Sequence, residues 1–180
     1  MARFRRVGHE LGWLEAAGCL MDTHHHTVVE TTQPNLGVGM QRVQGGHSRW
    51  LNARHAREGQ VFRHRFWSKR VVDDGWLFRA CIYVVVNPVA AGLCVHPADW
   101  TWSSYATTAY GDPDVYAGGE ERLLTMFGSS PKEARRRYIE VVDEAVELVR
   151  ARRIAEGQVA WQALADLEAR VWRSREQVSG

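Results

Sequence analysis

The chain has 180 residues, of which 45% are hydrophobic and 24% charged, and its formal net charge is +2. This length suits one ordinary domain with an appendage. Neither an 18-residue apolar run nor the apolar stretch of a secretory signal occurs, so we expect a cytoplasmic protein with no membrane partner. Cys19, Cys81 and Cys94 contain no C-x-x-C pair, which predicts free, mostly buried thiols.

Four elements are expected in the first 72 residues. Apolar residues at spacings of three and four predict a helix over residues 3–16. The β-branched end of CLMDTHHHTVVE, followed by the turn-like TTQPN, predicts a strand over residues 17–30. A helix is expected over residues 36–54, although the glycine pair Gly45-Gly46 weakens it. Aromatic and β-branched residues then predict a second strand over residues 61–72.

The next segment is expected to form a buried helix and an aromatic coil. Asp73-Asp74 supplies the negative charge that suits a helix start, and the apolar helix that follows reaches Asn87-Pro88. Gly92 marks a turn. Residues 97–110, with the sequence PADWTWSSYATTAY, are expected to be irregular and to pack on the core.

The C-terminal third is expected to be helical after a loop with the sequence GDPDVYAGG. Ser130 and Pro131 have the residue types of an N-cap and a first helical position. Helices should then continue to about Arg173, with a break near Gly157. These elements together predict an α+β fold, in which a small antiparallel sheet is backed by helices.

Positive charge is concentrated in one segment. From Arg42 to Arg70, eight Lys/Arg residues stand against one acid, Glu58, whereas the remainder of the chain has a net charge of −5. The eight are Arg42, Arg49, Arg54, Arg57, Arg63, Arg65, Lys69 and Arg70. Such a segment on a near-neutral chain indicates a localised polyanion site, with a solvated helix face as the alternative.

The histidine triplet is the sharpest chemical feature. Side chains alternate along a strand, so His24 and His26 would share one face and His25 would point to the other. Two imidazoles on one face can converge on a divalent cation. The alternative is three surface histidines.

Tyr83 and Asn87 are four residues apart and would share one face of the predicted helix. A phenol becomes a useful nucleophile when a cation polarises the phosphate that it attacks. The amide oxygen of Asn87 could complete the shell of that cation. The alternative is that Tyr83 is an ordinary core residue with a satisfied hydroxyl.

Four ordered blocks resemble the HUH transposases, particularly the branch of REP-associated tyrosine transposases. The blocks are MDTHHHTVV, GQVFRHRFWSKRV, IYVVVNPVAAGLC and DWTWSSY, and the segment that contains them runs from Leu11 to Tyr105. ERLLTMFGSSPKEARRRY also resembles the C-terminal extension of some members. No single block is specific, and the resemblance depends on the ordered set.

The resemblance implies a role for each matching position. His24 and His26 match a pair that binds Mg²⁺ or Mn²⁺, with Asn87 where a third ligand can stand. Tyr83 matches the nucleophile that cleaves and rejoins single-stranded DNA through a 5′-phosphotyrosine. Arg65 matches an arginine expected near a phosphate of single-stranded or hairpin DNA. The other DNA-binding positions expected in the basic segment are Lys69, Arg70, Arg63, Arg42 and Arg49.

The family fold implied for residues 1–112 is a ferredoxin-like antiparallel sheet packed by helices, followed by a helical extension over residues 113–180. This chain departs from the pattern at Asp22, Thr23 and His25, and the usual N-terminal strand is expected to be missing. A catalytically degenerate module that binds single-stranded or hairpin DNA is therefore a second interpretation. A metal-binding protein unrelated to DNA is a third, and the chain could be a monomer or a homodimer.

Overall fold

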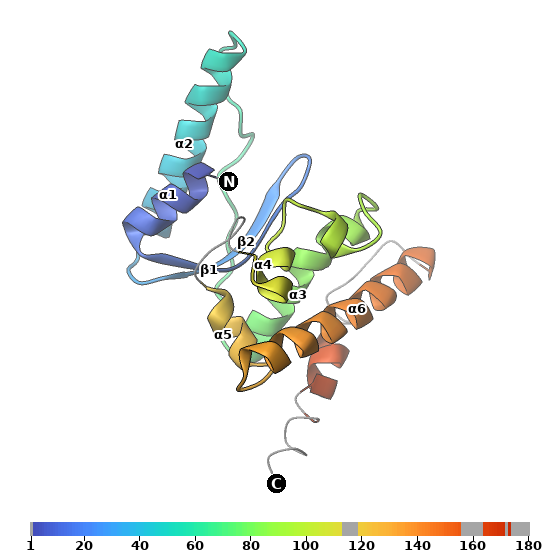
Figure 1. Cartoon of the computed structure of the whole chain (residues 1–180). Helices are drawn as coiled ribbons and strands as arrows, with labels where there is room; N and C mark the ends of the chain where they lie inside the picture. Colours follow the sequence, from blue (N-terminus) through green and yellow to red (C-terminus); the bar gives the residue numbers. More distant parts are fainter. Residues whose placement is uncertain (1, 113–118, 156–163, 172, 174–180) are drawn as a thin grey trace. The chain divides into compact units, whose positions relative to one another are not determined.

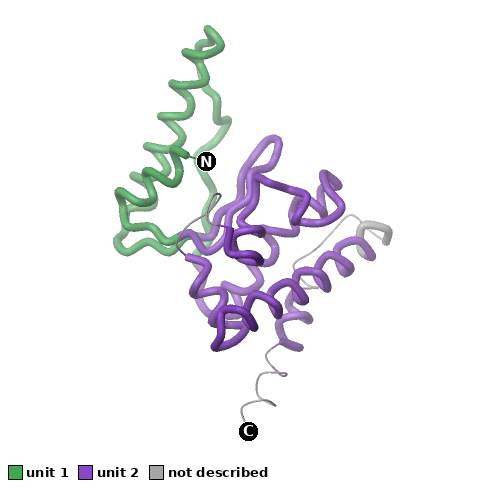
Figure 2. The backbone as a smooth tube through the Cα atoms, in the orientation of Figure 1, with its two compact units in different colours: residues 1–14, 29–70 green, residues 15–28, 71–180 purple. Residues whose placement is uncertain are grey.

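The computed structural model describes residues 2–112, 119–155, 164–171 and 173 (Figure 1). The chain divides into two compact units, which Figure 2 distinguishes by colour. Unit 1 comprises residues 1–14 and 29–70, and unit 2 comprises residues 15–28 and 71–180. The expected α+β class is confirmed, because the described elements are helices and one sheet of two antiparallel strands. None of the described helices has both the length and the apolar character that a membrane span needs.

The sheet is a hairpin of β1, Trp13–Leu20, and β2, His25–Thr31. The prediction of a single strand over residues 17–30 was therefore wrong. The chain reverses at residues 21–24, where the Met21 backbone N–H donates to the His24 carbonyl oxygen at 2.9 Å. This turn lacks the glycine or proline that usually signals a reversal.

Helix α1, Ala2–Leu11, is shorter than the helix predicted over residues 3–16. Gly12 follows it with a φ of +69°, a left-handed conformation that ends the helix and that glycine adopts at little cost. β1 begins at the next residue. The predicted helical position Leu14 consequently lies on a strand and is exposed.

Unit 1 has a small core between α1 and α2, Leu36–Arg54, whose predicted bounds are confirmed. Its buried members are Phe4, Trp13 and Met40. Gly39 permits the close approach of Trp13, because a Cβ at this position would overlap the indole ring. Asn35 fixes the same indole, since its Oδ1 accepts a hydrogen bond from Trp13 Nε1 at 2.7 Å.

The strand predicted over residues 61–72 does not form, and this segment is irregular. Burial does not alternate along it, as a strand face against a core would require. Phe66 packs against the small core of unit 1, whereas Trp67 is 82% exposed. A run of charged residues surrounds these aromatic side chains, so the aromatic content that suggested a strand is not buried as one.

Unit 2 contains the principal hydrophobic core, which α3, Asp74–Ala90, shares with α6, Pro131–Ala155. The predicted start of α3 is confirmed, because Asp73 Oδ1 accepts a hydrogen bond from the Trp76 backbone N–H at 2.6 Å. The helix continues three residues beyond Asn87 and contains Pro88 in its last turn.

The segment over residues 97–110 is only partly irregular. It contains the short 3-10 helix η1, Pro97–Asp99, and helix α4, Tyr105–Tyr110. Between them the chain runs beside β1, forming an antiparallel bridge between Cys19 and Ser103. The predicted packing of this aromatic segment on the core is confirmed by the burial of Tyr105.

The C-terminal part consists of α5, Glu120–Thr125, the long helix α6 and helical residues 164–171. The predicted start of α6 is confirmed, since Ser130 Oγ accepts a hydrogen bond from the Glu133 backbone N–H at 3.2 Å. The break expected near Gly157 lies outside the described residues.

Candidate metal and nucleophile site

The loop between β1 and β2 holds two of the three histidines against each other. His24 is the last loop residue and His26 is the second residue of β2. Their Nε2 atoms are 3.1 Å apart, and their rings meet edge to face with centroids 4.8 Å apart. Thr23 Oγ1 lies 3.1 Å from His24 Nδ1, which helps to orient that ring. The pair expected to converge is therefore in contact, although His24 precedes the strand.

This spacing suits two ligands of one small cation. His24 Nε2 and His26 Nε2 lie 3.1 Å apart, so both imidazoles could hold the same cation. Imidazole nitrogen also binds several transition metals, so the geometry favours a divalent cation without fixing its identity.

The electrostatics of His26 favour the neutral, metal-binding form. Burial lowers the pKa of His26 below its usual 6.5, and the neighbouring imidazoles of His24 and His25 lower it further. A neutral imidazole offers a lone pair to a cation, whereas a protonated ring does not. His26 is consequently prepared for coordination at neutral pH.

Helix α3 brings Tyr83 to the same place. Most of the neighbouring side chains on this helix are buried, but Tyr83 and Asn87 are only partly buried and lie one turn apart. The rings of His26 and Tyr83 meet edge to face, with centroids 5.6 Å apart. Residues 57 positions apart in the sequence are thereby joined into one cluster of His24, His26 and Tyr83.

Other described tyrosines of unit 2 are less suited to act as a nucleophile. Tyr105 and Tyr138 are buried in the core, and burial raises the pKa of both phenols above the usual 10. Tyr110 is 61% exposed, but its ring contacts Tyr105 rather than a histidine of the pair. Tyr116 lies outside the described residues.

The observed contacts join two imidazoles and a phenol, and the Asn87 amide is a ligand expected from the sequence alone. Among the described residues, no group of three or more His, Cys, Asp or Glu side chains could hold a metal ion. Asn87 is the remaining donor expected from the sequence, and it follows Tyr83 by one helical turn. A cation here would keep several positions for water or for phosphate oxygens, which suits Mg²⁺ or Mn²⁺.

The cysteines take no part in this cluster. Cys19 and Cys81 are buried free thiols and Cys94 is partly buried, as predicted. Burial raises the pKa of Cys19 to about 12 and raises that of Cys81 as well. These groups stay protonated at neutral pH and are therefore poor nucleophiles and poor metal ligands.

The basic residues singled out for DNA binding all belong to unit 1, whereas the histidine–tyrosine cluster belongs to unit 2. All six side chains are exposed: Arg42, Arg49, Arg63, Arg65, Lys69 and Arg70. Unit 1 as a whole contains eleven Lys/Arg and three Asp/Glu residues, a net charge of +8. A positive excess of this size is the electrostatic pattern of a unit that binds phosphates.

Thr23 is the residue of the site that the sequence did not single out. Its hydroxyl touches the His24 ring because the hairpin turn places the two side chains together. The only signal in the sequence was a hydroxyl residue next to the triplet, which is too common to be specific.

Comparisons of the chain with protein-family models, with curated proteins and with solved structures find no match.

Proposed function

We propose that this protein is a metal-dependent transposase that cleaves and rejoins single-stranded DNA through Tyr83. The observation that carries the proposal is the contact of Tyr83 with His26, which itself touches His24 through a 3.1 Å approach of ring nitrogens. A phenol beside two convergent imidazoles has the parts of a phosphoryl-transfer site with a covalent intermediate. We also propose that the α+β fold is of the ferredoxin-like type and that the protein is cytoplasmic.

The resemblance to HUH transposases implies the proposed steps, and Tyr83 is the nucleophile in them. Tyr83 attacks the scissile phosphorus, a bond forms from its oxygen to phosphorus, and the bond to the 3′ oxygen breaks. The phenol loses its proton in this step, and the departing 3′ oxygen takes up one proton. The products are a 5′-phosphotyrosine and a free 3′-hydroxyl. Attack by the 3′-hydroxyl of a second strand reverses the exchange and releases Tyr83. Because the phosphotyrosine conserves the bond energy, no nucleotide cofactor is required.

The roles of the other residues are positional and electrostatic. His24, His26 and Asn87 would hold Mg²⁺ or Mn²⁺, which supplies charge that polarises the scissile phosphate when it is bound. His26 enters this role without losing a proton, because its pKa is already lowered by burial. Arg65 and its basic neighbours in unit 1 would bind the phosphates of single-stranded or hairpin DNA.

A second function is a DNA-binding module that has lost catalysis. The observation in its favour is the departure of the histidine block from the family pattern at Asp22, Thr23 and His25. The basic surface of unit 1 would then carry the whole function, and Tyr83 would be a residue at the edge of the core.

The test is covalent adduct formation with a pool of randomised single-stranded DNA in the presence of Mn²⁺. The wild type should give a protein–DNA band that survives denaturation, and Tyr83→Phe should give none. Phenylalanine keeps the ring, so the circular dichroism spectrum should not change. Tyr110→Phe is the matched control, because it removes an exposed phenol from the same unit. No adduct with the wild type, or an adduct with Tyr83→Phe, would overturn the proposal.

A further inference from the structure

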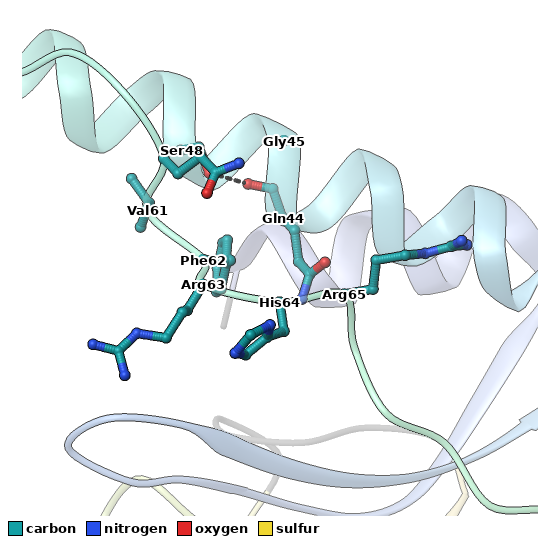
Figure 3. Close-up of a pocket in the computed structure, with 9 residues that line it drawn as sticks. Gln44, Gly45, Ser48, Val61, Phe62, Arg63, His64 and Arg65 are labelled. Carbon is teal, nitrogen blue, oxygen red and sulfur yellow. Dashed lines mark hydrogen bonds between the residues drawn. The ribbon is translucent and has the colours of Figure 1, made fainter.

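A groove of about 510 Å³ lies in unit 1, between α2 and the irregular segment that follows it (Figure 3). Gln44 and Gly45 line it from the helix, and residues 60–65 line it from the other side. It is an open depression on the surface of unit 1 and not an enclosed cavity. Gly45 keeps the helix side open, because it has no side chain.

The groove is held open from both ends of the irregular segment. At one end, Asn52 Nδ2 donates a hydrogen bond to the Gly59 carbonyl oxygen at 2.9 Å, and Gly59 has a φ of +93° that suits the turn. At the other end, Phe66 packs against the small core of unit 1. These two anchors fix the chain between them beside α2, so the groove is built into the unit.

Arginines, glutamine amides and two rings, those of Phe62 and His64, line this groove. Figure 3 shows Gln44 extending from α2 toward the segment, and the guanidinium groups of Arg63 and Arg65 extending in opposite directions. Gln60 supplies a second amide, and Phe62 supplies a ring whose centroid is 5.9 Å from that of His47. Within the described part of the chain, the amides and guanidinium groups that line the groove make no side-chain hydrogen bond or ion pair.

This set of groups matches one nucleotide. Guanidinium groups bind phosphates, and an aromatic ring stacks on an unpaired base. A glutamine amide, which has one acceptor and two donors, pairs in bidentate fashion with N6 and N7 of adenine. The charge of +8 on unit 1 favours a polyanion over a neutral ligand.

We propose that the groove binds one unpaired adenine nucleotide of single-stranded DNA. Gln44 and Gln60 read the base edge, Phe62 stacks on the base, and Arg63 and Arg65 bind the phosphates on either side. The choice of DNA as the polymer rests on the proposed function, whereas the recognition of an unpaired nucleotide rests on the groove itself. The proposal makes unit 1 a source of sequence preference and not only of charge.

The proposal is tested by placing a larger side chain at Gly45, on the α2 side of the groove. Gly45 lines the groove, and a Cβ there meets only Arg49 Nη1, at 3.6 Å, so Gly45→Leu adds apolar bulk at the groove wall without displacing backbone. Gly37→Leu is the matched control on the same helix, because a Cβ at Gly37 has nothing within 4 Å. Both changes replace a helical glycine with a better helix former, so their effects on helix stability have the same sign.

Binding is measured on the full chain by fluorescence anisotropy with labelled deoxyadenosine, deoxythymidine and deoxycytidine homopolymers of equal length. The wild type and Gly37→Leu should bind the deoxyadenosine polymer roughly 5- to 100-fold more tightly than the other two. Gly45→Leu should bind all three alike, with the salt dependence of phosphate contacts retained. A wild type without this preference, or a Gly45→Leu protein that keeps it, would overturn the proposal.

Two further measurements distinguish the proposed groove from the choice of DNA as the ligand and from the proposed transposase reaction. Tighter binding of an adenosine ribopolymer than of the DNA polymer would exclude DNA as the ligand. The covalent adduct is assayed on the same proteins. An adenine preference that depends on Gly45 without any adduct would support the groove and overturn the transposase, whereas an adduct without that preference would do the reverse.

Discussion

The two compact units differ in charge and in the size of their cores. Unit 1 has a net charge of +8, whereas unit 2 contains twelve Lys/Arg and eighteen Asp/Glu residues, a net charge of −6. The small overall charge of +2 is therefore the sum of two larger unit charges of opposite sign. A polyanion in solution is attracted to the first unit and repelled by the second at distances within a Debye length, about 8 Å at physiological salt.

The cores differ as much as the charges. Unit 1 buries a cluster of three hydrophobic side chains, Phe4, Trp13 and Met40. Unit 2 buries a much larger cluster, in which Phe78 and Ile82 of α3 and Tyr138 of α6 are fully covered. Since stabilisation grows with the apolar area removed from water, unit 2 is the better support for a site that needs fixed geometry.

The proposed function divides between these two units. The histidine pair and Tyr83 lie on the well-packed, acidic unit, whereas the basic side chains proposed to bind DNA lie on the thinly packed, basic unit. Under the proposed function, substitutions in one unit should change binding without chemistry, and substitutions in the other should change chemistry or stability without binding.

The largest effect on stability is expected from truncating a buried side chain in the core of unit 2. Phe78 is fully buried and its ring lies 5.7 Å from that of Phe127. Phe78→Ala should lower the free energy of unfolding by about 3–5 kcal/mol, because it removes transfer energy and leaves a cavity. Urea denaturation followed by circular dichroism measures the loss.

The control for this truncation is a substitution of an exposed apolar residue in unit 1. Val38 is 50% exposed on α2, and Val38→Ala should change the free energy of unfolding by no more than about 0.5 kcal/mol. Equal losses in the two variants would mean that stability is not concentrated in unit 2, and the comparison of the cores would then be wrong.

Helices were the most predictable part of the fold, because their ends carry local signals. The bounds of α2 and the starts of α3 and α6 follow from apolar spacing and from the caps at Asp73 and Ser130. The hairpin was missed because its turn at residues 21–24 lacks the usual glycine or proline. The end of α1 depends on Gly12, whose positive φ is a property of the folded backbone.

The residue types in the sequence were enough to propose the histidine–tyrosine site, but they could not predict the distances between its side chains. The triplet predicted that His24 and His26 would meet, whereas their contact with Tyr83 depends on the packing of α3 against the hairpin. The groove in unit 1 was not predicted, although Arg63 and Arg65, which line it, were expected to bind DNA. It exists because residues 61–72, predicted as a strand, instead run as an irregular segment beside α2.

A smaller effect is expected from removing charge in unit 1. Replacing Arg65 and Arg70 together by glutamine should weaken binding to single-stranded DNA and reduce the log–log salt slope by about 1.4, at about 0.7 per phosphate neutralised. Both side chains are exposed, so the fold should be unaffected. Anisotropy titrations over a series of salt concentrations measure the slope.

The matched control removes two exposed arginines from unit 2. Arg122 and Arg136 form surface ion pairs with Asp74 and Glu140, and replacing both by glutamine changes the net charge by the same amount. The salt slope should stay that of the wild type. If both pairs reduce the slope equally, DNA responds to total charge, and the division of charge between the units has no role in binding.

The smallest effect is expected in the dependence of stability on pH, through His26. Its pKa is below 6.5 in the folded chain, because of burial and then the neighbouring His24 and His25, and it returns to about 6.5 on unfolding. Between these two values the unfolded state binds more protons than the folded state. The free energy of unfolding should therefore fall as the pH is lowered from about 7 through 6.5, and it should level off below the folded pKa.

His26→Gln removes this titration, so its stability curve should be flatter than that of the wild type between pH 7 and the acid plateau. Less than one proton is exchanged, so the wild-type slope from this group stays below about 1.4 kcal/mol per pH unit. The measurement is the urea midpoint across this pH range in EDTA, which keeps metal binding out of the comparison. Val38→Ala is the control in unit 1, because it removes no titratable group, and its curve should have the wild-type slope. If His26→Gln keeps the wild-type slope, the ring is solvated in the folded protein, and the packing of His26 against Tyr83 would have to be given up.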